Sequence, residues 1–302
     1  MKTSGEHVVH LKMNLQYIIL GATVRLLSQF SPERSSDVCG FIARAIGPLL
    51  PVSRIAASNL KMAFPGLTDA CHRTILRESW DNLGRVVGEF PHLSKLDRTP
   101  DGPGWEIFGA EHIETGFHGG RPPLFFSAHI GNWEMILPVA SALSLPIAGI
   151  YRKASNQVVA ALVQEMRFLA APGVKMFPKG SHGAKAIIGH LASGGSIGLL
   201  VDQKMNDGIS VQFFGRAAWT APAIARLALR FERDIVPVRV RRVGPARFRL
   251  ICDAPLRITR TGDRRADEIS IMSTINRHIE SWICEEPSSW LWFHRRWPKV
   301  RA

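Results

Sequence analysis

One segment of this chain, PPLFFSAHIGNWEMILPV at residues 122–139, joins a short apolar run to a helical pattern through a sharp turn. The run PLFFSA suits a buried strand, and Gly131 and Asn132 are turn and N-cap residues that can start a helix at Trp133. A buried strand that turns at once into a helix favours an α/β fold. It also places His129 at the carboxyl end of a strand, where open α/β sheets bind ligands.

Strand and helix patterns alternate through the rest of the chain. An element is expected at IFGAEHIE, and strands are expected at 146–152, 174–178 and 196–203. Helices are expected at 133–144, 156–169, about 182–192, 220–232 with Thr220 as N-cap, and 264–285. Residues 234–243 and 246–256 predict a hairpin joined at Gly244 and Pro245. The sequence therefore predicts a central mixed β-sheet flanked by helices.

The first third of the chain has a different pattern. Residues 1–95 are helical throughout, so we expect a helical N-terminal, membrane-associated region followed by an α/β domain over 96–302. Met13–Val24 offers only twelve uncharged residues, fewer than the roughly 20 that a bilayer-spanning helix needs. Because lysines and an arginine surround this stretch, 11–29 is interpreted as a helix at a membrane interface, the alternative being an amphipathic helix packed on the domain.

Charge and cysteine content restrict the partners and the compartment. A formal net charge of +13 indicates anionic partners such as nucleic acid, phospholipid headgroups, a phosphorylated glycolipid or an acidic carrier protein. The four cysteines form no CxxC pair, so the sequence predicts neither a metal site nor a disulfide framework, and a reducing cytoplasm fits them best. The N-terminus shows no signal-peptide pattern.

His129 and Glu134 are the candidate catalytic pair. About one His-x4-Asp/Glu match is expected by chance among 11 histidines and 25 acidic residues, and the chain has two. The second, His92 and Asp97, lacks a preceding apolar strand and leads into a Pro/Gly-rich stretch. The strand-turn-helix context therefore favours His129.

The same context allows the pair to cooperate. Within one continuous helix, side chains five residues apart point about 140° away from each other. Across a turn, Glu134 can fold back onto the imidazole of His129 and hold one nitrogen protonated, which leaves the other free as a base. The alternative is a buried structural histidine beside a helix-capping glutamate.

Two other motifs point to different functions. GGSIG at 194–198 matches the G-x-S-x-G pattern of serine hydrolases, but an expected helix precedes Ser196 and a strand follows it, the reverse of the required order. Gly194 and Gly195 are better interpreted as a helix C-cap. Tryptophans and arginines cluster in the last 21 residues, a pattern that suits binding to a nucleic acid or to a membrane interface. The structural alternative is that the tryptophans close the core and the arginines are solvated. No nucleic-acid motif accompanies them, so no nucleic-acid partner is expected.

Ordered blocks from about 105 to 298 resemble the late acyltransferases of lipid A biosynthesis, the lauroyl and myristoyl transferases of the glycerolipid acyltransferase group. These blocks are HIGNWE at 129–134, YRKASN at 151–156, EMRFLA at 165–170, LLVDQK at 199–204, FFGRAAWTAPAIARLA at 213–228 and WLWFHRRWP at 290–298. The N-terminal 95 residues match only loosely, as helices. The chain departs from the family in its short N-terminal apolar stretch and in RRWP at its end. The short stretch argues against a true transmembrane anchor.

The resemblance implies transfer of a fatty acyl chain from an acyl carrier protein to a hydroxyl of a phosphorylated lipid A precursor, without cofactor or metal. His129 would be the general base and Glu134 its orienting partner. Arg152, Arg167 and Lys179 would hold phosphates or the developing oxyanion. The remaining substrate-binding candidates are Asn132, Asp202, Gln203 and Thr220, with Asp202 and Gln203 positioning acceptor groups or Arg152.

The resemblance also implies a location, an anionic membrane surface at the cytoplasmic face of the inner membrane. Within the same class, the alternative is an acyl-CoA-dependent mannoside, glycolipid or lysophospholipid acyltransferase. In another class, it is a non-enzymatic basic protein that binds membranes or nucleic acid.

Overall fold

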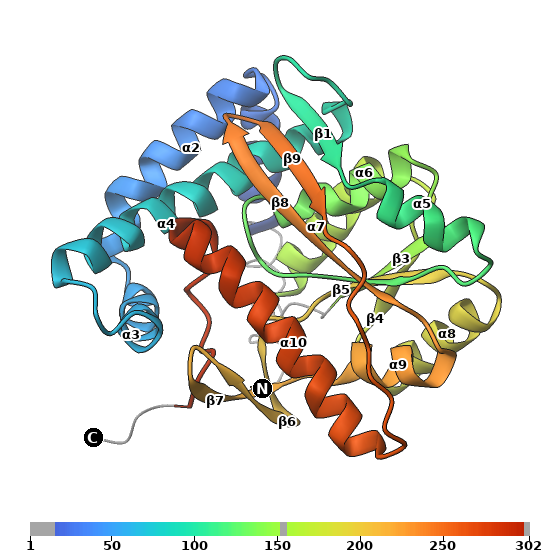
Figure 1. Cartoon of the computed structure of the whole chain (residues 1–302). Helices are drawn as coiled ribbons and strands as arrows, with labels where there is room; N and C mark the ends of the chain where they lie inside the picture. The colour runs from blue at the N-terminus through green and yellow to red at the C-terminus, as the bar shows by residue number, and fades with distance from the viewer. Residues whose placement is uncertain (1–15, 152–155, 299–302) are drawn as a thin grey trace, which may run out of the picture.

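A computed structural model describes residues 16–151 and 156–298, and it shows an α/β fold built on a seven-stranded mixed sheet (Figure 1). The strand order is β1-β9-β8-β2-β5-β3-β4. The strands are β1 (Gly104–Phe108), β2 (Leu124–Ser127), β3 (Ile147–Tyr151), β4 (Met176–Pro178), β5 (Ser196–Leu200), β8 (Ile235–Gly244) and β9 (Arg247–Cys252). This confirms the predicted central mixed sheet.

Strand direction decides which chain segments meet at each edge of the sheet. β8, β2, β5, β3 and β4 run parallel to one another, while β8 and β9 form the predicted antiparallel hairpin. Because β2 and β5 are neighbours, the segments that leave their carboxyl ends lie side by side.

Side chains alternate across β2 and divide the core between the two faces of the sheet. Leu124 and Phe126 pack with α8 (Ser181–Ala192), α9 (Ala223–Phe231) and α10 (Arg264–Glu285). Phe125 packs on the other face, where α5 (Glu111–His118) and α6 (Ile136–Ala142) contribute Ile113 and Ala140. Figure 1 shows α10 crossing in front of the sheet. Both faces are covered, as a parallel sheet requires.

The N-terminal helices pack onto this same core. They are α2 (Pro32–Ile46), the 3-10 helix η1 (Gly47–Leu49), α3 (Ser53–Ala63), α4 (Asp69–Glu89) and the 3-10 helix η2 (Phe90–Lys95). Ala56 and Leu60 of α3 are fully buried in the cluster that contains Leu124 and Phe126. Asn59 donates hydrogen bonds to the carbonyls of Trp292 and His294, so α3 is bound to the C-terminal segment.

Part of the expected interfacial helix, residues 11–15, lies outside the described residues. The remainder contains a helix, Gln16–Leu27, with exposed apolar side chains that include Ile18 and Ile19. Within the described ranges, no single helix is long and apolar enough to cross a bilayer. The pair Pro32–Leu49 and Ser53–Ala63 meets the length and composition test only when taken together, and it is bent by 86°.

The long elements agree closely with the sequence-based expectations. α7 (Gln157–Ala170), α8 and α10 lie where the sequence places them. The predicted N-cap of the 220–232 helix is wrong, because α9 begins at Ala223 after Pro222 and Thr220 ends strand β7 (Arg216–Thr220). β7 pairs with β6 (Lys204–Phe213) in a separate antiparallel hairpin that the sequence analysis did not anticipate.

Candidate active site

The candidate site forms where β2 and β5 end. Ser127 pairs with Leu200, the last residue of β5, and the N–H of Val201 donates to the carbonyl of Ser127 over 3.1 Å. His129 lies two residues after Ser127, and Asp202 lies two residues after Leu200. The parallel register therefore brings together two residues that lie 73 positions apart in the chain.

Asp202 is fully buried and binds His129 twice. Its Oδ1 lies 2.8 Å from Nδ1 of the imidazole, and its Oδ2 accepts the backbone N–H of His129 over 3.0 Å. Oδ2 also accepts from the indole Nε1 of Trp290 over 2.8 Å. Three donors thus hold one carboxylate in a single orientation, and the carboxylate in turn fixes the plane of the imidazole.

This arrangement sets the charge of the carboxylate and the tautomer of the ring. Burial alone raises the pKa of Asp202, but the charge of His129 and the hydrogen bonds from its ring and backbone outweigh burial and hold that pKa well below its ordinary value. An ionised carboxylate only accepts hydrogen bonds, so Nδ1 of His129 carries the proton. The lone pair of the neutral ring is then on Nε2, which can act as a base.

Nε2 of His129 lies on the accessible side of the site. The His129 side chain is 15% exposed, and its Nε2 lies 3.4 Å from the amide nitrogen of Gln203. The ring of Trp133 meets the imidazole edge to face at 5.1 Å, and the ring of His294 lies 6.4 Å away. Burial lowers the pKa of His294 despite the nearby Asp202, which favours a neutral imidazole beside His129.

The turn after His129 depends on Gly131 and Asn132, as predicted. Gly131 adopts φ 58°, and a Cβ atom there would lie 2.2 Å from the carbonyl oxygen of Val240, so only glycine fits. Asn132 is the N-cap of the 3-10 helix Trp133–Met135, and its side chain accepts from the N–H of Glu134 over 3.2 Å. Asn132 is fully buried, and its amide donates to Glu89 over 2.8 Å, so both ends of this side chain are engaged within the protein.

The structure corrects the predicted partner of His129. Glu134 does not fold back onto the imidazole. It accepts two hydrogen bonds from Arg167 of α7, from Nε over 2.8 Å and from Nη2 over 2.6 Å, and a third from the indole of Trp133 over 3.0 Å. The cap at Asn132 holds the backbone of Glu134 so that the carboxylate meets α7, while Asp202 occupies the Nδ1 side of the imidazole.

The Glu134–Arg167 pair lies at an apolar cavity of about 300 Å³. The cavity lies between α6, α7 and β4, and it is lined by Leu137, Gln164, Arg167, Phe168, Ala171, Val174 and Met176. Burial alone lowers the pKa of Arg167, but the carboxylate of Glu134 outweighs this effect and raises it, so the guanidinium remains charged. A charged group at the wall of an apolar cavity suits an amphipathic ligand.

The other predicted site residues lie in different environments. Arg152 lies outside the described residues. Lys179 is exposed directly after β4, at the same sheet edge as His129 but separated from it by β5 and β3. Thr220 is fully buried and accepts a hydrogen bond from Nη2 of Arg296 over 2.7 Å, so its hydroxyl is engaged in the core.

The serine and the first glycine of the G-x-S-x-G motif at 194–198 have structural roles. Ser196 is the first residue of β5, fully buried, and its hydroxyl donates to the carbonyl of Pro123. Gly194 follows the end of α8 with φ 85°, in agreement with the predicted helix C-cap. In the second His-x4-Asp pair, His92 is buried in η2 and Asp97 is exposed.

The C-terminal tryptophans close the core, and three of the four, Trp290, Trp292 and Trp297, are at most 4% exposed after α10 ends. Trp282 within α10 is buried as well. The expectation that the arginines are solvated is wrong for Arg296, which is fully buried with its guanidinium 4.8 Å from the ring of Phe213. Burial lowers the pKa of Arg296 to about 10.

The sequence pattern predicts Asp202 as a substrate contact and does not indicate Trp290 as a site residue. Both lie in the blocks that carry the family resemblance, and that is the signal that could have joined them to His129. Within 16–151 and 156–298, no group of three or more His, Cys, Asp or Glu side chains is placed to hold a metal ion.

Comparison with known families shows which family the chain belongs to. The family model described as bacterial lipid A biosynthesis acyltransferase matches residues 1–299, which is nearly the whole chain and includes the N-terminal helices. None of the curated proteins compared with the chain matches it.

Proposed function

Because the chain belongs to the bacterial lipid A biosynthesis acyltransferases, it is an acyltransferase, and we propose that it transfers a fatty acyl chain from an acyl carrier protein thioester to a hydroxyl of the lipid A precursor. The observation that carries this proposal is the His129–Asp202 pair, with Nδ1 held by a buried carboxylate and Nε2 facing the accessible side. A formal charge of +13 favours an acidic carrier and a phosphorylated acceptor.

In the proposed reaction, Nε2 of His129 takes the proton of the acceptor hydroxyl while its oxygen attacks the thioester carbonyl carbon. The tetrahedral intermediate collapses, the C–S bond breaks, and the imidazolium returns the proton to the leaving thiolate. Asp202 stabilises the imidazolium that exists between these two proton transfers. A positioned general base of this kind contributes about 10²- to 10⁴-fold to the rate. No acyl-enzyme is needed, in keeping with a buried Ser196.

The cavity beside Glu134 and Arg167 is the proposed binding site for the acyl chain. Its apolar walls come from α6, α7 and the segment leading into β4. Glu134, which pairs with Arg167 at the cavity wall, directly follows Trp133, whose ring contacts that of His129. Glu134 would then contribute by holding Arg167 at the cavity wall. Arg152, Lys179 and Gln203 remain proposed contacts for phosphate or acceptor groups, and of these Lys179 and Gln203 follow strands that end at the same sheet edge as β2.

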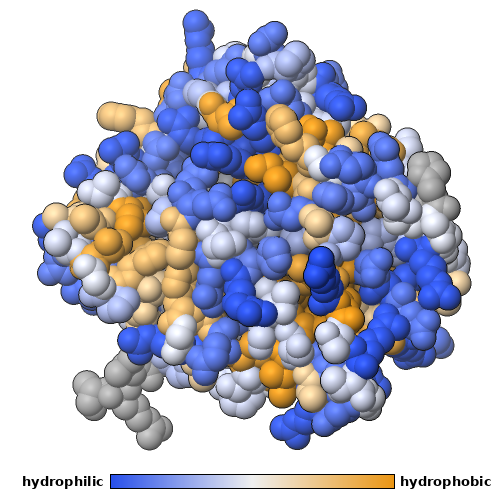
Figure 2. Space-filling model, viewed as in Figure 1, coloured by the Kyte–Doolittle hydropathy of each residue, from blue (hydrophilic) through white to orange (hydrophobic). Residues whose placement is uncertain are grey.

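We also propose attachment to the cytoplasmic face of the inner membrane, and exposed apolar side chains of the N-terminal helices support the membrane contact itself. On α2, Val38, Phe41, Ile42 and Ile46 recur at helical spacing and form one exposed stripe that Leu49 continues. An uncovered apolar surface of this kind is typical of a membrane contact. Figure 2 shows apolar side chains gathered on the left, over the end of the molecule formed by α2, α3 and α4.

The test uses the purified full-length protein with two donors, an acyl carrier protein thioester and acyl-CoA, and three acceptors, a lipid A precursor, a mannoside and a lysophospholipid. We expect product only with the carrier thioester and the lipid A precursor, and none with His129→Ala. Product from acyl-CoA would overturn the donor, and full activity of His129→Ala would overturn the mechanism. In cells lacking the protein, mass spectrometry of lipid A should show one missing acyl chain.

Attachment to the membrane is tested by flotation with anionic phospholipid vesicles. The double variant Phe41→Glu, Ile46→Glu should lose most vesicle binding, whereas Ile269→Glu, which changes an exposed apolar residue of α10, should bind like the parent. Equal binding by all three proteins would exclude the α2 stripe as the contact.

A further inference from the structure

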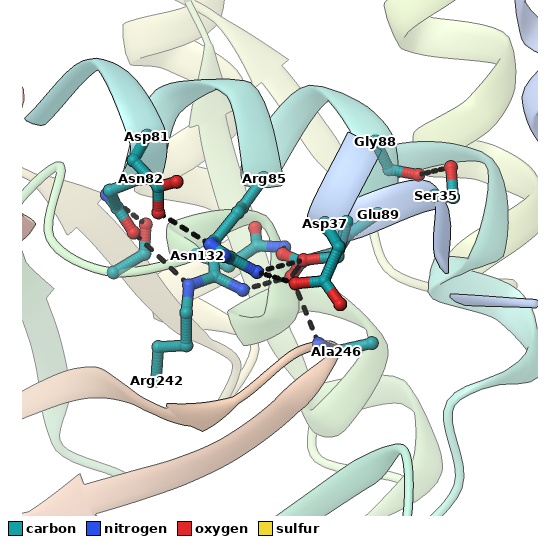
Figure 3. A network of polar contacts seen from close by, with 12 residues as sticks. Ser35, Asp37, Asp81, Asn82, Arg85, Gly88, Glu89, Asn132, Arg242 and Ala246 are labelled. Carbon is teal, nitrogen blue, oxygen red and sulfur yellow. Dashed lines mark hydrogen bonds and ion pairs between the residues drawn. The ribbon is translucent and has the colours of Figure 1, made fainter. Parts of the chain in front are cut away.

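Helix α4 of the N-terminal region contacts the turn after His129 through Asn82, and Figure 3 shows Asn82 on this helix with Arg242 and Glu89. The side-chain amide nitrogen of Asn82 donates to the carbonyl of Gly131 over 3.2 Å and to the carbonyl of Ser289 over 3.1 Å. An asparagine amide has two N–H donors, and here each serves a different chain segment. Asn82 therefore ties the turn after His129 to the segment that precedes Trp290.

These two segments carry the groups that orient Asp202. Ile130 and Trp290 form an isolated antiparallel bridge. The N–H of Gly131 donates to the carbonyl of Ser289 over 3.0 Å, and the N–H of Leu291 donates to the carbonyl of His129 over 2.9 Å. One bridged segment carries His129 and the other carries Trp290, and both side chains form hydrogen bonds with Asp202. Any shift between the two segments changes the position of the carboxylate relative to the imidazole.

A second residue of α4 holds the same turn. Glu89 lies seven residues after Asn82, two helical turns further along the same face. It is fully buried and accepts from the side chain of Asn132 over 2.8 Å and from the N–H of Ala246 over 3.2 Å. Arg242 of β8 connects the two α4 residues, because it forms an ion pair with Glu89 and its Nε donates to Oδ1 of Asn82 over 3.3 Å.

We propose that Asn82 is a positioning residue for the His129–Asp202 pair, held in place by Arg242 and Glu89. The expected loss of acyl transfer rests on the proposed function, whereas the expected change in the geometry of the His129–Asp202 pair does not. Catalysis by a general base depends on geometry at the level of 1 Å, and a misplacement of that size costs about 10²-fold. The N-terminal region thus contributes to the geometry of the active site through α4.

The decisive variant is Asn82→Asp, which keeps the size of the side chain and an oxygen for Arg242 but removes both N–H donors. Asn276→Ala is the matched control. Asn276 is fully buried on α10, and its amide also donates to a backbone carbonyl, that of Gln212, but in the β6 strand away from the turn. The melting temperature of each variant checks that it folds.

Two readouts separate positioning from general stability. The first is the low-field proton NMR signal of His129 Nδ1–H, assigned by its absence in His129→Gln. We expect Asn276→Ala to keep this signal and Asn82→Asp to lose it or broaden it by exchange. The second is steady-state acyl transfer by the full-length protein, in which Asn82→Asp should lower kcat at least about tenfold with KM within about threefold.

The proposal is overturned if Asn82→Asp keeps the Nδ1–H signal, or if its kcat is within about twofold of that of Asn276→Ala. If the parent protein transfers no acyl chain from any donor, the proposed function fails. The NMR comparison then still decides whether Asn82 positions the pair.

Discussion

The carboxylate of Asp202 binds both the backbone N–H and the ring Nδ1 of His129, over 3.0 and 2.8 Å, and is itself fully buried. One side chain therefore fixes the position and the tautomer of the imidazole together. In a buried pair of this kind, removing the negative charge leaves the ring free to rotate or to change tautomer.

Asp202→Asn should lower kcat about 10³-fold with a small effect on KM, because the neutral amide neither fixes the Nδ1–H tautomer nor stabilises the imidazolium. Steady-state kinetics at saturating donor measure this. Asp267→Asn, which neutralises a buried carboxylate bound by Thr261 at the start of α10, is the control and should keep full activity. Equal rates for both variants would remove Asp202 from the mechanism.

The same carboxylate predicts how stability depends on pH. The pKa of Asp202 is lower in the folded protein than in the unfolded chain, where it lies near its ordinary value of about 3.9. Its contribution is therefore complete above about pH 4 and is lost as the pH falls from there toward the folded-state pKa. Thermal melts should show the difference between parent and Asp202→Asn narrowing below about pH 4. A constant difference across that range would contradict this.

Glu134 and Arg167 should behave as a coupled pair in stability measurements. Glu134→Gln or Arg167→Met alone leaves the other charge without its partner, at a half-buried position for Arg167 and a buried one for Glu134, so each should cost about 3 kcal/mol in the free energy of unfolding. The double variant should cost less than the sum, with a coupling of about 2 kcal/mol. Denaturant unfolding of the four proteins gives this coupling, and additive losses would show that the pair is not energetically linked.

Gly131→Ala tests the turn. Gly131 has a positive φ, and an added Cβ atom would lie 2.2 Å from a carbonyl oxygen, whereas Gly120 has φ 73° and open space around it. Gly120→Ala should cost about 1 kcal/mol from backbone strain alone. Gly131→Ala should cost clearly more and should abolish activity, because the turn must move away from Val240. Denaturant unfolding and acyl transfer are measured for both variants. Equal stability and equal activity of the two variants would contradict the predicted role of Gly131.

Ser196→Ala should leave acyl transfer unchanged, since the hydroxyl is buried against the carbonyl of Pro123. The lost hydrogen bond should lower the free energy of unfolding by about 1 kcal/mol. A large loss of activity in a variant with a near-parental melting temperature would instead indicate a serine nucleophile.

The local sequence determined the strand, the turn and the helix around His129, because each depends on neighbours within a few residues. Gly131 supplies the positive φ, Asn132 caps the following helix, and the apolar run before them can only be buried. The same reasoning placed α10 and the β8–β9 hairpin, whose patterns are long and regular. It misplaced Thr220, because the partner that buries its hydroxyl is Arg296, at the far end of the chain.

Only the tertiary structure decided which carboxylate meets His129. Spacing along the chain favours Glu134, five residues away, but the order of parallel strands places the end of β5 beside the end of β2 and brings Asp202 to the imidazole. Glu134 instead accepts hydrogen bonds from Arg167 of α7. The local pattern predicts this helix but does not place it relative to the turn. The position of His129 at the end of a strand was thus encoded locally, and its carboxylate partner was set by which strands become neighbours in the sheet.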